Sequence, residues 1–100
     1  MKLLSIEPAT NGFKKYVARF IVNDKPRNVY FGAVGYGDFI QYSKQGKDIA
    51  QEKRKAYIAR HGANEDWTDP TKPGTLSRYI LWEYPTFQRA LKEYKRRFGL

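Results

Sequence analysis

The stretch KRKAYIARHGANEDWTDPTKPGTLSRYILWEY, residues 53–84, decides how the chain is organised. Its first part is a basic segment with helical character that runs to Arg60. Gly62 follows shortly afterwards, and glycine is common just after the end of a helix. An acidic, proline-containing loop then leads into a second apolar segment, Ser77–Trp82. We therefore expect a long basic helix, a turn and a shorter helix in this part of the chain.

The other helices are predicted from caps and spacing. One or two helical turns are expected over Phe39–Gln45, because Asp38 can cap that segment. The long helix should begin at Lys47 or Asp48 and end near His61. Thr75 is the expected cap of the short helix that ends at Trp82 or Glu83, and Thr86 that of the last helix, residues 87–98. In the last helix the apolar residues that share one face are Phe87, Ala90, Leu91, Tyr94 and Phe98.

Before the helices, apolar and polar residues alternate as in β-strands. Residues 2–8 and Lys14–Val22 have this pattern, and a turn containing Asn11-Gly12 separates them. Pro26 has no backbone N–H for a strand ladder, so a third strand, Arg27–Phe31, is expected to begin after it. The predicted fold class is α+β: a three-stranded antiparallel meander over residues 2–32, followed by three helices packed on one face. The chain should form a single domain, residues 1–100, with its helical part over residues 38–98.

Composition narrows the possible partners. The formal charge is +9, from 19 Lys and Arg against 10 Asp and Glu, which favours nucleic acid, an anionic membrane surface or an acidic protein. The absence of cysteine excludes disulfides, thiolate metal sites and cysteine nucleophiles. No apolar run approaches the length of a membrane span. The first residues lack the apolar region of roughly 7–15 residues found in signal peptides, so none is expected.

The long helix carries a cluster of cations around one tyrosine. Lys53, Arg54, Arg60 and His61 stand three or four positions from Tyr57, and so share its helical surface. Cations around an aromatic ring suit a phosphate backbone with a stacked base. The alternative is that Tyr57 belongs to the core, while the cations extend outward or pair with the acidic turn.

The last helix adds a second basic surface, because Glu93 is its only acid. Such cations contact phosphates without reading bases, so binding should be independent of sequence and strongly dependent on salt. An ordinary solvated helix face is the alternative. The expected nucleic-acid-binding residues are Lys53, Arg54, Tyr57, Arg60, Arg89, Lys92 and Arg96.

Catalytic signatures are weak. The glycine-rich run FGAVGYGDF, residues 31–39, lacks the Lys-Ser/Thr of a phosphate-binding loop. Asp38, Glu65 and Asp66 could hold a metal ion for phosphodiester cleavage, but nucleases need more carboxylates than these. We therefore expect no catalytic, metal or cofactor site. The two tryptophans, Trp67 and Trp82, are expected in the core; an exposed platform for single strands is the alternative.

Four ordered motifs carry a resemblance to a known family. They are VYFGAVGYGDF (29–39), RKAYIARH (54–61), EDWTDP (65–70) and SRYILWEYPT (77–86). Together they resemble a domain-of-unknown-function family of small basic proteins from large nucleocytoplasmic DNA viruses, including marseillevirus-, mimivirus-, chlorella-virus- and iridovirus-like groups. The resemblance covers roughly residues 28–98 and transfers no catalytic residue. The chain departs from the family pattern at Tyr42, where a histidine is common.

The resemblance implies a viral protein of the virion and host cytoplasm (the viral factory). With the charge pattern, it leads us to expect a non-enzymatic virion- or genome-associated protein that binds nucleic acid, DNA rather than RNA. The alternative is a structural or protein-interaction module, such as a minor virion component that contacts acidic virion proteins or forms a homo-oligomer. A metal-dependent nuclease is the remote alternative.

Overall fold

The sheet consists of three antiparallel strands in the order β1-β2-β3 in a computed structural model that describes residues 1–100. The strands are β1 (Lys2–Pro8), β2 (Lys14–Val22) and β3 (Lys25–Ala33). Asn23 and Asp24 form the tight turn between β2 and β3, and both have positive φ. Asn11 organises the first turn, where its Oδ1 accepts hydrogen bonds from two backbone N–H groups. The predicted meander is confirmed.

Strand β3 begins earlier than the sequence predicted. It starts at Lys25, and Pro26 lies within it, opposite Ile21 of β2. Because β3 is an edge strand, a residue without an N–H is tolerated there. The expectation that the strand would start after Pro26 was therefore wrong.

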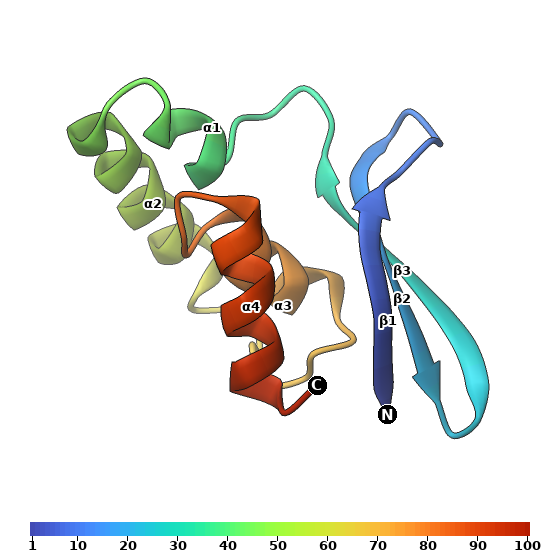
Figure 1. Ribbon diagram of the computed structural model, residues 1–100. Coiled ribbons are helices and arrows are strands. Elements are labelled where there is room, and N and C mark those ends of the chain that lie inside the picture. Colours follow the sequence, from blue (N-terminus) through green and yellow to red (C-terminus); the bar gives the residue numbers. More distant parts are fainter.

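The helices follow the sheet and lie on one side of it (Figure 1). They are α1 (Phe39–Ser43), α2 (Lys47–His61), α3 (Pro73–Leu76), the π-helix η1 (Ser77–Leu81) and α4 (Phe87–Phe98). Segments α3 and η1 are consecutive and form the short second helical region that the sequence predicted. The α+β class with an N-terminal meander is confirmed. None of the helices has the combination of length and apolar character that a membrane span needs.

Two of the three predicted caps are confirmed. Asp38 Oδ1 accepts a hydrogen bond from Gln41 N at 2.9 Å, and Thr86 Oγ1 accepts one from Arg89 N at 3.3 Å. The third was wrong, because the helix begins at Pro73 and Thr75 lies inside it. Thr75 is fully buried, and its hydroxyl donates to Asp66 O at 3.4 Å. Proline is well suited to the first helical position, where no N–H partner is needed.

The core lies between the sheet and the helices. Phe20 and Phe31 on the inner face of the sheet are buried, as are Leu76, Ile80 and Tyr94 from the helical part. Segments α3 and η1 pack on β3, and α4 packs on η1. Helix α2 joins this core through a different contact, the stacking of aromatic rings described below.

Candidate nucleic-acid interface

Tyr57, the centre of the predicted cationic cluster, belongs to the core. Its ring stacks on that of Trp82, with centroids 4.5 Å apart and planes 7° from parallel. The His61 ring also lies 4.5 Å away, and Tyr57 is only 6% exposed. Burial and nearby Glu65 raise the pKa of its hydroxyl, so the ring stays neutral. No face of Tyr57 is open to a stacked base. Of the two alternatives for this residue, the structure therefore supports the one that places Tyr57 in the core.

Arg54 also serves the structure. Its Nη2 donates to Glu83 Oε2 at 2.5 Å, and its Nε donates to Trp82 O at 3.1 Å. Arg78, which is 11% exposed, donates to the same oxygen of Glu83. Although burial acts to raise the pKa of Glu83, the hydrogen bonds from Arg54 and Arg78 outweigh burial and lower it. Arg54 therefore joins α2 to the end of η1 rather than facing a ligand.

The remaining predicted cations point to solvent. Lys53 and Arg60 on α2 are exposed, as are Arg89 and Lys92 on α4, and none of the four forms an ion pair. Arg96 is exposed and pairs with Glu93, at 2.7 Å. Four members of the predicted set are thus exposed and without a counter-charge.

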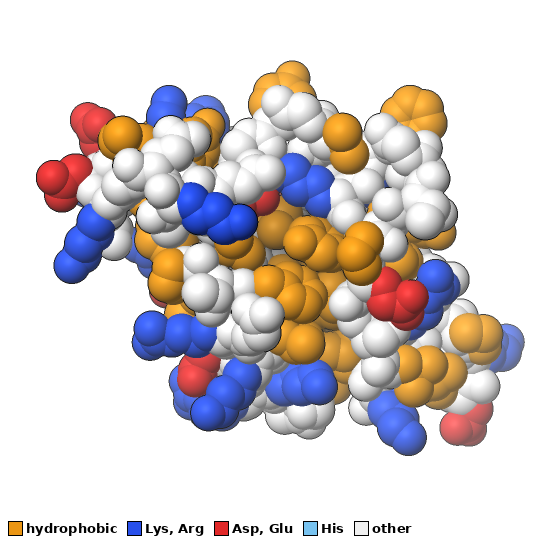
Figure 2. Space-filling view, turned by 45° about the horizontal axis from the view of Figure 1, so that its top comes forward, with side chains coloured by type: hydrophobic (Ala, Val, Ile, Leu, Met, Phe, Trp, Pro, Cys, Tyr) orange, Lys and Arg blue, Asp and Glu red, His pale blue; other side chains and the backbone are white.

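Helices α2 and α4 each place one arginine against the same short segment, residues 82–84. On one side, Arg54 of α2 bonds to Trp82 and Glu83. On the other, the guanidinium of Arg89 lies 5.3 Å from the centre of the Tyr84 ring. Figure 2 shows Lys and Arg side chains around the helical half of this face, and fewer over the sheet. Both helices therefore lie beside this segment, in the half of the molecule where most Lys and Arg side chains of this view gather.

A groove of about 510 Å³ lies between α2 and the segment that follows β3. It brings the predicted residues Lys53 and Arg60 together with Lys14 and Tyr36, which sequence reasoning did not select. Six of the residues that line it are Lys14, Tyr36, Tyr42, Lys53, Arg60 and Glu65. The Lys53 ammonium lies 5.5 Å from the centre of the Tyr42 ring, so an aromatic side chain already holds one of these cations.

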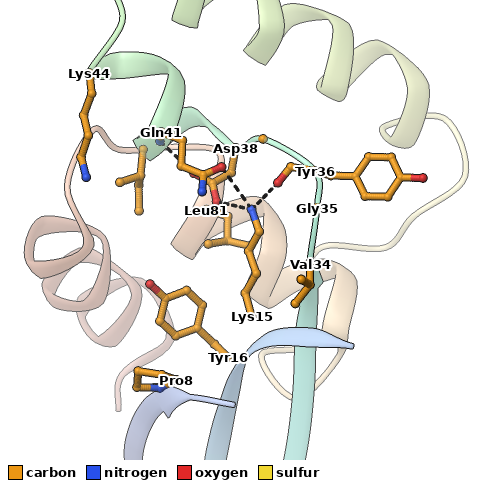
Figure 3. A pocket seen from close by; sticks show the side chains of 12 residues that line it. Pro8, Lys15, Tyr16, Val34, Gly35, Tyr36, Asp38, Gln41, Lys44 and Leu81 are labelled. Atoms are coloured by element: carbon orange, nitrogen blue, oxygen red, sulfur yellow. Dashed lines mark hydrogen bonds and ion pairs between the residues drawn. The ribbon is translucent and has the colours of Figure 1, made fainter. Parts of the chain in front are cut away.

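A partly buried lysine, Lys15, fixes the segment between β3 and α1. Lys15 Nζ donates to Tyr36 O at 2.6 Å and to Asp38 Oδ2 at 2.7 Å (Figure 3). Gln41 lies at the edge of the same network, and these residues line a second hollow of about 590 Å³. The ring of Tyr36 points away from this ion pair in Figure 3 and is 74% exposed. The backbone of Tyr36 is therefore tied down, while its side chain is free.

The glycines on either side of Tyr36 give the signal that could have identified it. Gly35 has φ +91°, which favours glycine. A Cβ on Gly37 would lie 2.5 Å from the Tyr42 ring, so the chain needs a small residue there. A tyrosine between two such glycines has few neighbours to cover it. The motif G-Y-G therefore marks an exposed ring on a constrained turn.

The carboxylates of the nuclease alternative have structural partners. Asp38 caps α1 and pairs with Lys15. Glu65 accepts a hydrogen bond from Trp67 Nε1 at 3.2 Å, and Asp66 accepts from the hydroxyl and the N–H of Thr68. No group of three or more His, Asp or Glu side chains is arranged to hold a metal ion.

Neither tryptophan forms an open platform for a base. Trp82 is buried against Tyr57, and the Arg78 guanidinium lies 5.1 Å from the centre of the half-buried Trp67 ring.

Comparison of the chain with protein-family models, curated proteins and solved structures found no match.

Proposed function

We propose that the chain is a small non-enzymatic protein of a large DNA virus, associated with the virion or genome, that binds nucleic acid without reading its sequence. DNA is the proposed ligand in preference to RNA. The motif resemblance supports the viral origin. The binding surface consists of the free cations of α2 and α4, with Lys53, Arg60, Arg89 and Lys92 as the contacts to phosphates.

The observation that carries this proposal is the imbalance of ion pairing. Only five of the 19 Lys and Arg side chains pair with a carboxylate. The others keep their charge without a partner, and those of α2 and α4 share one half of the molecule. Lys and Arg side chains that neutralise phosphates release the counterions condensed on the nucleic acid, which drives binding at low salt.

The test is a salt titration with a labelled duplex of about 30 base pairs. With four phosphate contacts, we expect the logarithm of the association constant to fall linearly with the logarithm of the salt concentration, with a slope of about −3 to −4. Replacing Arg89 and Lys92 together by Glu should weaken binding at least tenfold and flatten the slope. Both side chains are exposed, so circular dichroism should show that the variant stays folded.

A matched control has the same change in charge elsewhere. Lys2 and Lys25 are exposed and lie at the end of the sheet where β2 turns into β3. If only net charge matters, replacing both by Glu will weaken binding as much as the α4 variant, and the surface assignment fails. Absence of duplex binding by the unmodified protein at low salt would remove the proposal itself.

A structural interaction module is the second candidate. Phe13, at the tip of the first hairpin, is 79% exposed, and Val34 beside it is also exposed. An apolar tip of this kind suits contact with another protein or a second copy. Light scattering of the unmodified protein and of Phe13→Ser tests this: a monomer in both cases counts against self-association.

A further inference from the structure

The groove between α2 and the turn after β3 holds features that duplex binding does not use. Tyr36 presents an aromatic ring to solvent from a turn that Lys15 and the flanking glycines hold in place. A tyrosine so exposed contributes little to the core, since its ring makes no aromatic contact with the rest of the protein. The fold therefore keeps this ring available.

The charge around the ring is positive. Lys14, Lys53 and Arg60 line the groove without an ion pair. Two carboxylates also line it: Asp38 is neutralised by Lys15, and Glu65 lies 3.4 Å from His61 Nδ1. The three cations without an ion pair thus outnumber the one carboxylate, Glu65, that has no Lys or Arg partner.

We propose that this groove binds single-stranded nucleic acid, with one unpaired base stacked on Tyr36 and neighbouring phosphates on Lys14, Lys53 and Arg60. A cationic groove combined with an aromatic ring is how proteins hold single strands without sequence preference. The bases of a duplex already stack on their neighbours, so their faces are closed to Tyr36. This inference rests on the proposed function and names the form of nucleic acid that the groove accepts.

The size of the groove agrees with this assignment. About 510 Å³ falls within the range of clefts that hold one small ligand, such as a nucleotide unit. The outer cations Arg89 and Lys92 lie on α4 and do not line the groove, so they serve a duplex but not the groove. Lys53 and Arg60 can contact the phosphates of either form, and Tyr36 is the groove residue that requires an unpaired base.

The experiment compares oligo(dT) of about 15 nucleotides with a matched duplex, by fluorescence anisotropy at fixed low salt. Tyr36→Ala should weaken oligo(dT) binding at least about fivefold, the lower limit for losing one stacked base, and leave duplex affinity unchanged. Tyr36→Trp should restore oligo(dT) binding, because indole also stacks. Tyr30→Ala is the matched control: Tyr30 is another exposed tyrosine, 41% exposed, on β3 outside the groove.

Each outcome has one meaning. Equal oligo(dT) affinities for Tyr36→Ala, Tyr30→Ala and the unmodified protein would overturn the groove assignment. If the duplex still bound in a salt-dependent way, the proposed function would survive that result. Weaker oligo(dT) binding in Lys14→Gln, with the duplex little affected, would support the groove, because Lys14 lines it and is not one of the proposed duplex contacts. Absence of binding to both ligands by the unmodified protein would overturn both proposals.

Discussion

At the scale of single residues, Glu83 is the counter-charge for two arginines. Arg54 and Arg78 both donate to one of its oxygens, and all three side chains are largely buried. Replacing Glu83 by Gln leaves two guanidinium groups without a counter-charge. We expect a loss of about 2 kcal/mol in the free energy of unfolding, typical of a charged hydrogen bond in a partly buried site. Urea unfolding at neutral pH measures it.

Glu83 should also make the free energy of unfolding depend on pH. The pKa of Glu83 lies below its ordinary 4.5, because hydrogen bonds from Arg54 and Arg78 outweigh the effect of burial. A carboxyl whose pKa is lower in the folded state stabilises the protein fully above its unfolded pKa, and this stability is lost as pH falls through the folded pKa. The difference between the unmodified protein and Glu83→Gln should therefore shrink below about pH 4.5. A difference that grows in acid would contradict this assignment.

Gly32 is a second residue with a predictable role. Its φ is +78°, and an added Cβ would lie 2.8 Å from Leu81 Cδ1 and 3.2 Å from Lys15 Cβ. Gly32→Ala should lower the free energy of unfolding by about 1–3 kcal/mol, from backbone strain and overpacking together. Gly12→Ala is the control, since its φ is +80° but no atom lies within 4 Å of the added Cβ. An equal loss in both variants would show that the contact with Leu81 has no effect.

At the scale of elements, regular periodicity is what the sequence revealed well. The alternation in β2 and the cap at Thr86 predicted both elements, because these signals are local. The π-helix η1 was not predictable, since its hydrogen-bond pattern depends on packing against β3 and α4. The burial of Tyr57 depends in the same way on Trp82, which lies 25 positions further along the chain.

The residues of the candidate site also fall into two groups: those that local sequence can identify and those that depend on contacts between distant segments. The cations of α2 and α4 could be selected from spacing and composition, because charged side chains mostly remain exposed. The sequence did not reveal that Arg54 faces Glu83, as this pair forms only when α2 packs beside η1. The exposure of Tyr36 depends on a hydrogen bond to its carbonyl from Lys15, 21 residues away. Contacts between distant segments therefore decide which of the candidate side chains can meet a ligand.

The N-terminal cap of α4 should contribute measurably to the stability of the fold. Thr86 Oγ1 accepts from Arg89 N, and α4 supplies Ala90 and Tyr94 to the core. Thr86→Ala should lower the free energy of unfolding by about 1 kcal/mol, the usual effect of removing a cap. Thermal unfolding followed by circular dichroism measures this, with exposed Thr10→Ala as control. An unchanged midpoint would mean that solvent replaces the lost hydrogen bond.

At the scale of the whole molecule, the charge that attracts a polyanion also repels itself. The net charge is +9, and most of the cations have no carboxylate partner. Folding brings these charges closer together than they are in the unfolded chain, which lowers stability at low ionic strength. Salt screens exposed charges strongly and partly buried pairs much less, so the pairs made by Glu83 and Asp38 should persist.

Added salt should therefore stabilise this protein. We expect the midpoint of thermal unfolding to rise between about 20 and 200 mM sodium chloride, as the Debye length falls to below about 10 Å. A protein that relied mainly on exposed ion pairs would show the opposite trend. The Lys2→Glu, Lys25→Glu variant has a net charge four units lower than the unmodified protein and should show a smaller rise. A midpoint that falls with salt would mean that attraction within the folded chain outweighs repulsion, and that fewer of its cations are free for phosphates than the structure indicates.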